Sequence, residues 1–155
     1  MERSDIQRAL EECGFFKGLR PAQVEGIAAI CRMQRADAGE ALYRQGELGE
    51  DLFIVVEGQV VLERAISVGV RRGPVAVAML GKGRIFGGWS TLLNEPHLLM
   101  LSAVCNKPAL LVAFKGTELR RLMTADMQLG FDLLEKLCFL LRERLQLALG
   151  AIENL

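Results

Sequence analysis

The sequence predicts a mainly β fold with flanking helices, in which an antiparallel double-stranded β-helix (a jelly roll) is followed by a long C-terminal helix. Two observations predict this fold. Between residues 33 and 115, short apolar runs alternate with glycine-containing turns, as expected of short antiparallel strands. After residue 117, apolar residues recur at helical spacing. A length of 155 residues corresponds to a single domain, which we assign to residues 1–155.

Residues 1–32 are expected to form two short helices. Ser4 and Gln7 have the spacing of a capping box, and apolar residues follow at helical spacing, so we expect the first helix to begin at Ser4. Pro21 suits the first turn of a second helix, because proline lacks the amide hydrogen that would be unpaired there.

Residues 33–115 are predicted to form a roll of about eight strands. Glycine turns separate the strands, among them Gln45-Gly46-Glu47 and Arg72-Gly73-Pro74. The clearest strands are expected in the runs Ala41–Arg44, Leu52–Glu57, Gln59–Ala65, Val75–Leu80, Met100–Val104 and Ala109–Phe114.

Charge and hydropathy limit the classes of function. The chain has 19 Lys and Arg residues and 19 Asp and Glu residues, so its net charge is zero. A nucleic-acid-binding surface needs an excess of positive charge, so we expect no direct DNA binding by this chain. The polar start and the short apolar runs predict no signal peptide and no membrane-spanning helix, and we expect a cytoplasmic location.

The cysteines and the single histidine limit the chemistry further. Cys13, Cys31, Cys105 and Cys138 lack the spacing of a metal site and are expected to be free thiols in a reducing compartment. Because His97 is the only histidine, no Ser/His/Asp or Cys/His arrangement is indicated, and we expect neither catalysis nor a metal site. His97 and Cys105 are the nearby residues able to ligate a haem, but nothing pairs them, so a haem is not favoured.

The segment from Gly39 to Val60 has a dense pattern of glycine, acidic and apolar residues. Its sequence, GEALYRQGELGEDLFIVVEGQV, resembles the pattern G-x-x-L-x-x-Q-G-E-x-x-D-x-L-Y/F-x-I/V-x-x-G-x-V of cyclic nucleotide-binding domains. Its glycines stand where hairpin corners need a positive φ. The resemblance extends from about residue 13 to the C-terminus and implies the jelly-roll fold of that family.

Residues 86–99 are similar to the phosphate-binding cassette of the same family, whose pattern is approximately F-G-E-L-A-L-L…P-R. Phe86, Gly87 and Pro96 agree with it. The family's glutamate, which holds the ribose 2′-hydroxyl, corresponds to Gly88, and its phosphate-pairing arginine corresponds to His97. The resemblance implies a ligand pocket formed by Phe86, Gly87, Gly88, Trp89, Ser90, His97 and Leu98.

These two substitutions predict weak binding or no binding of cAMP or cGMP in the family's usual manner. Backbone amides at the start of a short helix after Gly87 can still face a phosphate. His97, however, cannot make the bidentate pair that an arginine makes. Each lost charged contact is worth roughly 1.5–3 kcal/mol, so losing both predicts a decrease in affinity of roughly 10²–10⁴-fold.

Three interpretations of the pocket remain open. The pocket is collapsed, with Trp89, Leu98 and Leu99 as core residues; or it holds a different small ligand; or it binds a cyclic nucleotide through amides, His97 and residues of the C-terminal helix. No cofactor is assigned, and a cyclic nucleotide or another small molecule is the expected ligand class.

Helices are predicted to return over residues 117–155, with a break near Ala125. Apolar residues then recur at alternating spacings of four and three over about four heptads, which predicts a homodimer seam. Charged residues, Arg144 among them, flank the seam. A second apolar row, expected to cover the protein's own barrel, consists of Leu133, Leu137, Leu140 and Leu147. The seam consists of Met127, Phe131, Leu134, Cys138, Leu141, Leu145, Ala148, Ile152 and Leu155.

A similar helix forms the dimer in the catabolite activator/FNR regulators, where a helix-turn-helix DNA-binding domain follows it. The resemblance therefore implies a non-catalytic, ligand-sensing regulatory domain. Its ligand would bias two arrangements of the cassette and the C-terminal helix. The alternatives are the sensor half of a Crp/FNR-type transcriptional regulator without its DNA-binding domain, or a ligand-free dimerisation and interaction module.

Overall fold

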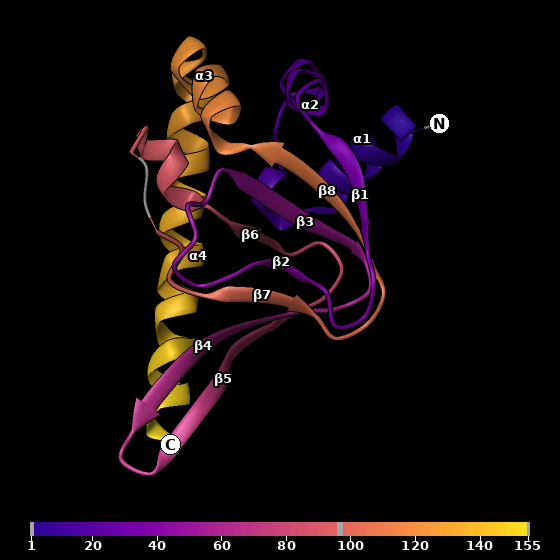
Figure 1. The fold of residues 1–155 in the computed structure, drawn as a ribbon. Coiled ribbons are helices and arrows are strands. Elements are labelled where there is room, and N and C mark those ends of the chain that lie inside the picture. The colour runs from indigo at the N-terminus through magenta and orange to yellow at the C-terminus, as the bar shows by residue number, and fades with distance from the viewer. Residues whose placement is uncertain (1, 96–97, 155) are drawn as a thin grey trace.

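The computed structural model describes residues 2–95 and 98–154 of the chain (Figure 1). Helices lie at both ends of the sequence and strands between them. The elements are α1 (Glu2–Glu12), η1 (Gly14–Phe16), α2 (Pro21–Ala28), β1 (Arg32–Ala36), β2 (Ala41–Tyr43), β3 (Asp51–Glu57), β4 (Val60–Val68), β5 (Arg71–Leu80), β6 (Ile85–Gly87), η2 (Trp89–Leu93), β7 (Ser102–Cys105), β8 (Ala109–Lys115), α3 (Gly116–Ala125) and α4 (Met127–Glu153).

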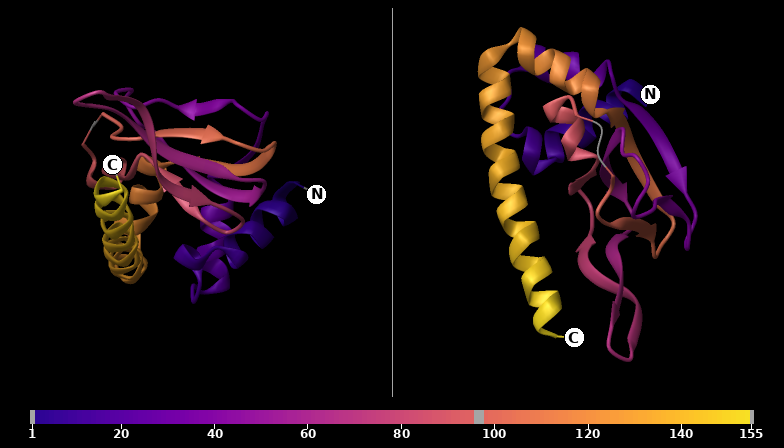
Figure 2. Two further views of the ribbon diagram at one scale, coloured as in Figure 1. Left: turned by 90° about the horizontal axis from the view of Figure 1, so that it is seen from below. Right: turned by 60° about the vertical axis from the view of Figure 1, so that its left-hand side comes forward.

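Within the described residues, the strands form two four-stranded antiparallel sheets that face each other. One sheet has the strand order β1-β8-β3-β6 and the other β2-β7-β4-β5. The predicted fold class, an antiparallel roll with flanking helices, is confirmed. Helix α4 runs along one side of the molecule, and the hairpin β4–β5 extends beside its C-terminal end (Figures 1 and 2).

The sheet that contains β3 is buried on both faces. Leu52 and Ile54 of β3 pack in the cluster shared with the helices, whereas Phe53 and Val55 pack in the cluster between the sheets. Side chains alternate between the two faces of a strand, so both sets of positions must be apolar. This explains the uninterrupted apolar run in β3.

The cluster between this sheet and the helices joins both ends of the chain. Leu10 of α1 and Ile27 of α2 contribute fully buried side chains from the N-terminal end. Leu133 and Leu137 of α4 pack into the same cluster. The predicted barrel-covering row agrees with the burial of these two leucines and with half-buried Leu140, but it is wrong for Leu147, which is 41% exposed.

The hairpin β4–β5 is longer than the sequence predicts. Val68 pairs with Arg71, so the turn lies at Gly69 and Val70 and not at Arg72-Gly73-Pro74. Strand β5 lies at the edge of its sheet, where a proline is tolerated because one side of the strand has no partner. The Gly-Pro pair, a common turn signal, is here part of an edge strand.

Two helix starts can be compared with the prediction. Helix α1 begins at Glu2, so the expected start at Ser4 is wrong by two residues. Glu2 and Asp5 place negative charge in its first turn, which the helix dipole favours. Helix α2 begins at Pro21, as predicted.

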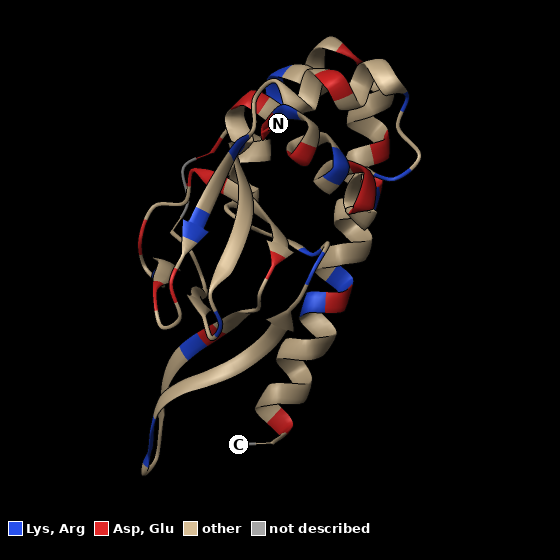
Figure 3. Ribbon diagram, turned by 90° about the vertical axis from the view of Figure 1, so that its right-hand side faces the viewer, with Lys and Arg blue, Asp and Glu red and all other residues tan. Residues whose placement is uncertain are grey.

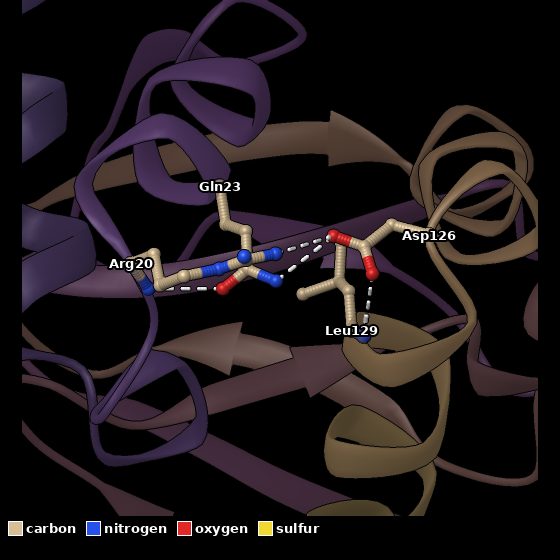
Figure 4. A network of polar contacts seen from close by, with 4 residues as sticks. All are labelled: Arg20, Gln23, Asp126 and Leu129. Carbon is tan, nitrogen blue, oxygen red and sulfur yellow. Dashed lines mark hydrogen bonds and ion pairs between the residues drawn. The ribbon is translucent and has the colours of Figure 1, made fainter.

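A polar network joins the α3–α4 corner to the start of α2 (Figure 4). Asp126 accepts a hydrogen bond from the amide of Leu129 at 3.2 Å and so caps α4. The other oxygen of Asp126 accepts from Gln23 Nε2 at 2.9 Å and pairs with Arg20 at 3.3 Å. The hydrogen bond from Gln23, then the one from Leu129, holds the pKa of Asp126 below its usual 3.8.

We expect Asp126→Ala to lower the midpoint of thermal unfolding at pH 7, because α4 loses its cap and its link to α2. A carboxylate with a lowered pKa in the folded state stabilises the protein above its unfolded pKa and loses this effect as the pH falls. The difference between wild type and variant should therefore shrink below about pH 4. Unfolding curves between pH 2.5 and 7 test this, and a difference that is constant with pH would contradict it.

Candidate ligand-binding site

Phe86 of β6 is part of the barrel core. Its ring stacks on Phe53, with centroids 5.4 Å apart, and lies 6.2 Å from Tyr43. Phe86 is fully buried. Phe86, a residue of the predicted pocket, therefore supports the site from within the barrel core.

The backbone of the cassette turns sharply after Phe86. Gly87 has a φ of 133°, and a Cβ there would lie 2.4 Å from the carbonyl oxygen of Asp51, so only glycine fits. The amide of Gly88 donates to the same oxygen at 2.9 Å. Trp89 and Ser90 then begin η2, and within the described chain their amides donate to no protein acceptor. The backbone donors that the cassette would offer to a phosphate are thus available.

Helix α3 holds the cassette in place. The buried Thr91 hydroxyl donates to the carbonyl of Gly88 at 2.6 Å. A Cβ at Gly116 would lie 1.7 Å from that hydroxyl oxygen, so α3 starts in direct contact with η2. Arg120 of α3 also donates to the carbonyl of Leu92. A shift of the cassette would therefore be transmitted to α3.

No side chain fits at residue 88 in this arrangement. A Cβ on Gly88 would lie 2.9 Å from the carbonyl carbon of Gly49, which is backbone and cannot rotate away. Gly49 is confined in turn, because a Cβ on it would lie 2.6 Å from Leu99 Cδ2. Leu99 is fixed by two backbone hydrogen bonds, from its amide to Glu47 and from Gly46 to its carbonyl. The family's glutamate could not be placed at residue 88 without moving this loop.

The collapsed-pocket interpretation, with Trp89, Leu98 and Leu99 as core residues, is wrong for Leu98, and Trp89 joins the core on the side of the helices and not in the pocket. Trp89 packs against Phe15, with ring centroids 5.3 Å apart, in the cluster next to the helices. Leu98 is 55% exposed and pairs with Leu48 in an isolated bridge. Only Leu99 is partly buried at the site. The sequence does not determine from which side of η2 the Trp89 side chain extends. His97, the remaining predicted pocket residue, lies outside the described residues.

A small cleft of about 200 Å³ lies next to the cassette. It is smaller than the roughly 300–1,000 Å³ of typical small-molecule sites. Acidic side chains lie along its rim, with Glu47 and Glu50 exposed. The cleft is lined by Leu42, Tyr43, Glu47, Leu48, Gly49, Glu50, Asp51, Phe53 and Leu99.

A larger groove of about 520 Å³ lies elsewhere, between α4, η1 and the start of β6. Two of its cations already have partners. Arg84 pairs with Glu143 at 2.6 Å, and Lys136 donates to the carbonyl of Lys17. Lysine, arginine and acidic residues are interspersed over the helices and loops (Figure 3).

Arg144 of α4 lies against the barrel next to the cassette, whereas the sequence pattern predicts a charge that flanks the seam. Its Nη2 donates to the carbonyl of Ile85 at 2.8 Å. Burial, and then the nearby charge of Arg84, lowers the pKa of Arg144. The spacing could have revealed this, because residue 144 follows Leu137 and Leu140 in the row that faces the barrel.

The outer face of α4 is apolar and exposed. Of the predicted seam residues, Met127, Phe131, Leu134, Leu141, Leu145 and Ile152 are between 42% and 76% exposed, and Cys138 is also exposed. Ala148 is half-buried. Leu149, four residues after Leu145, is 52% exposed and continues the apolar stripe instead of Ala148. Leu155 lies outside the described residues.

The cysteines are all unpaired in the structure. Burial raises the pKa of the Cys13 and Cys105 thiols. In the described part of the chain, no three histidine, cysteine or acidic residues gather as metal ligands. Among the same residues, none of the helices has the length and hydropathy needed to span a bilayer.

Comparison with known proteins supports the resemblance found in the sequence. A family model described as "Cyclic nucleotide-binding domain" matches residues 33–126. A protein of Thermus thermophilus named "Cyclic AMP receptor protein" is 32% identical over 111 residues, which cover 72% of this chain and 45% of that protein. The chain spans less than half the length of the curated relatives that it matches.

Solved structures have the same fold. A cyclic nucleotide-binding domain from Methylobacillus flagellatus aligns with a TM-score of 0.77 and 20% identity, covering 98% of this chain and 83% of that one. A putative cyclic nucleotide-binding protein from Geobacter metallireducens aligns with a TM-score of 0.74 and 25% identity, covering 90% of this chain and 97% of that one. The arrangement of sheets and helices is therefore the one that these proteins share.

Because a Cβ at residue 88 would meet the backbone of Gly49, we expect Gly88→Ala to destabilise the protein by about 1–3 kcal/mol. Gly81→Ala is the matched control, since a Cβ there has no neighbour within 4 Å. The control should change stability by less than about 0.5 kcal/mol. Chemical denaturation measures both variants. Equal stabilities of the two variants would show that the 46–50 loop moves freely away from the cassette.

Proposed function

Because this chain belongs to the cyclic nucleotide-binding domain family, we propose that it is a non-catalytic regulatory domain that senses a small anionic ligand and binds cAMP or cGMP only weakly. The observation that carries the proposal is the cassette itself. Its backbone turn is present, and the amides of Trp89 and Ser90 donate to no acceptor in the described part of the chain, but residue 88 has no room for a side chain. The domain is suited to a phosphate but lacks the usual contact to a ribose.

Weak binding of cyclic nucleotides is also supported by the size and charge of the site. The cleft beside the cassette is small, and Glu47 and Glu50 on its rim repel a phosphate. A ligand would have to displace the segment that carries Gly49 and Leu99. The energy of that displacement would lower the apparent affinity.

We also propose a homodimer through the outer face of α4. An apolar stripe along a 27-residue helix is unusual on the surface of a monomer, and a two-fold axis along the helix would cover it in both copies. The dimer would place the two cassettes on either side of the paired helices. A change in the position of α4 would then reach both subunits.

A second candidate function is the sensor half of a Crp/FNR-type transcriptional regulator. It is favoured by the match to a cyclic AMP receptor protein of which this chain spans 45%. With a net charge of zero, the chain itself is not suited to bind DNA. The third candidate, a ligand-free interaction module, would use the α4 face alone.

Calorimetry with cAMP, cGMP and cyclic dinucleotides tests the sensing function, with the Thermus thermophilus cyclic AMP receptor protein measured alongside. We expect this chain to bind cAMP roughly 10²–10⁴-fold more weakly than that reference, because two charged contacts are absent. An affinity equal to the reference would contradict weak binding. A folded protein with no response to any of these nucleotides would favour the interaction module.

The dimer is tested with Leu145→Glu, which places a charge in the exposed stripe of α4. We expect wild type to sediment as a dimer and this variant as a monomer, because like charges would face each other across the two-fold axis. Phe139→Glu is the control, since Phe139 is similarly exposed (57% against 60%) but lies on another side of α4. Dissociation by both substitutions, or by neither, would argue against this interface.

A further inference from the structure

The side chain of Arg144 enters the molecule between α4 and β6. Its neighbours in the row along α4, Leu137 and Leu140, pack in the apolar cluster of the helices. At the next position of this row the chain has an arginine instead of a leucine. The guanidinium donates to the carbonyl of Ile85, one residue before Phe86 and the cassette turn.

That carbonyl lies on the open edge of β6. Two backbone hydrogen bonds flank the paired residues of β3 and β6. The amide of Val55 donates to the carbonyl of Arg84, and the amide of Gly88 donates to the carbonyl of Asp51, so Arg84 and Gly88 face β3. Because backbone groups alternate in direction along a strand, Ile85 and Gly87 face away from β3. Strand β6 is the last strand of its sheet, so Arg144 stands at the edge where the cassette begins.

Arg144 is half-buried and forms no ion pair within the described residues. Its Nε is buried and has no hydrogen-bond partner there. Its neighbour Glu143 pairs with Arg84 instead, and no other carboxylate forms an ion pair with Arg144 in that part of the chain. A buried cation without a counterion is unfavourable, whereas a leucine or methionine of similar volume would not be.

The cleft beside the cassette contains a polar group of its own. Tyr43 lines the cleft beside the cassette, and its hydroxyl makes no hydrogen bond within the described chain. Burial raises the pKa of Tyr43, and the charge of Arg144 partly opposes that rise. A phenol and a guanidinium can each donate hydrogen bonds to an anion.

Arg64 and Arg120 also lie near the cassette, and each donates to a backbone carbonyl. Arg64 is exposed and donates to the carbonyl of Met100 at 2.7 Å. Arg120 donates to the carbonyl of Leu92 on the side of α3. Of these three arginines, only Arg144 has a buried nitrogen without a hydrogen-bond partner in the described residues, and it contacts β6.

We propose that Arg144 supplies the cationic contact for a phosphate group bound at the start of the cassette, so that α4 provides the charge that the cassette itself lacks. This inference rests on the proposed sensing function and names the chemistry of its ligand. The phosphate would pair with the guanidinium and accept hydrogen bonds from the cassette amides. Ligand contact would then act directly on α4, whose next residue, Leu145, lies in the proposed dimer face.

The test compares wild type with Arg144→Met, using inorganic phosphate and cAMP as separate probes at constant ionic strength. Thermal unfolding and calorimetry are the readouts. We expect wild type to be stabilised by at least one probe and Arg144→Met to bind that probe at least tenfold more weakly. Without a probe, Arg144→Met should unfold at the same temperature as wild type or higher, because an unbalanced buried charge is removed.

Three controls make the result specific. Arg142→Met removes an exposed arginine two residues away, whose guanidinium carbon lies 5.2 Å from the Phe139 ring centroid, and should leave binding unchanged. Arg64→Met, near the cassette, should also leave it unchanged. Arg144→Lys keeps the charge without the planar fork and should bind with intermediate affinity, which gives a second variant should the methionine protein not fold.

The possible outcomes separate this inference from the proposed function. Binding of cAMP that is equal in wild type and Arg144→Met would overturn the inference and leave the sensing function intact. A response to phosphate that depends on Arg144, without any response to cAMP, would support the inference and count against cyclic nucleotides as ligands. No stabilisation of wild type by either probe, with Arg144→Met less stable, would overturn it and identify Arg144 as a structural brace.

Discussion

The burial of Leu133 and Leu137 of α4 in the cluster of the helices is the contact on which the rest of the structure depends. A helix of 27 residues gains most of its stability in a protein from packing of one face. These two leucines attach α4 to the β3-containing sheet and to the N-terminal helices at once. The attachment fixes the direction of every other side chain on α4. Arg144 thereby points toward β6, and Leu145 and Ile152 point into solvent.

A second constraint, the close contact of Gly88, Gly49 and Leu99, decides what the cassette can recognise. These residues are mutually dependent, because a side chain at either glycine would collide with another member of the group. The glycine at residue 88 is therefore not an isolated feature of the cassette. The leucine at residue 99 and the glycine at residue 49 fill the space from the other side, so the site is reshaped and not simply vacated.

Most of the fold could be predicted, because hairpin corners and strand alternation leave a local record in the sequence. Gly39, Gly46 and Gly58 have positive φ, as the turn pattern predicts. The site was less predictable, since its properties depend on the direction of side chains from short elements. The indole of Trp89 could face either side of η2, and its contact with Phe15 comes from a segment more than seventy residues away. Arg144 was missed because a charge within an amphipathic helix is ordinarily solvated.

The location of the positive charge has a mechanical consequence. An arginine within the cassette can bind a phosphate without moving any other element, so that ligand binding and helix position are coupled only through packing. An arginine on α4 makes the helix itself a ligand contact. A phosphate would then stabilise the arrangement in which α4 lies against β6 over one in which α4 has moved away. The size of this effect is set by the difference in phosphate affinity between the two arrangements. The α3–α4 corner, held by Asp126, is the point about which such a movement would occur, since α3 is fixed to the cassette through Thr91 and Gly116.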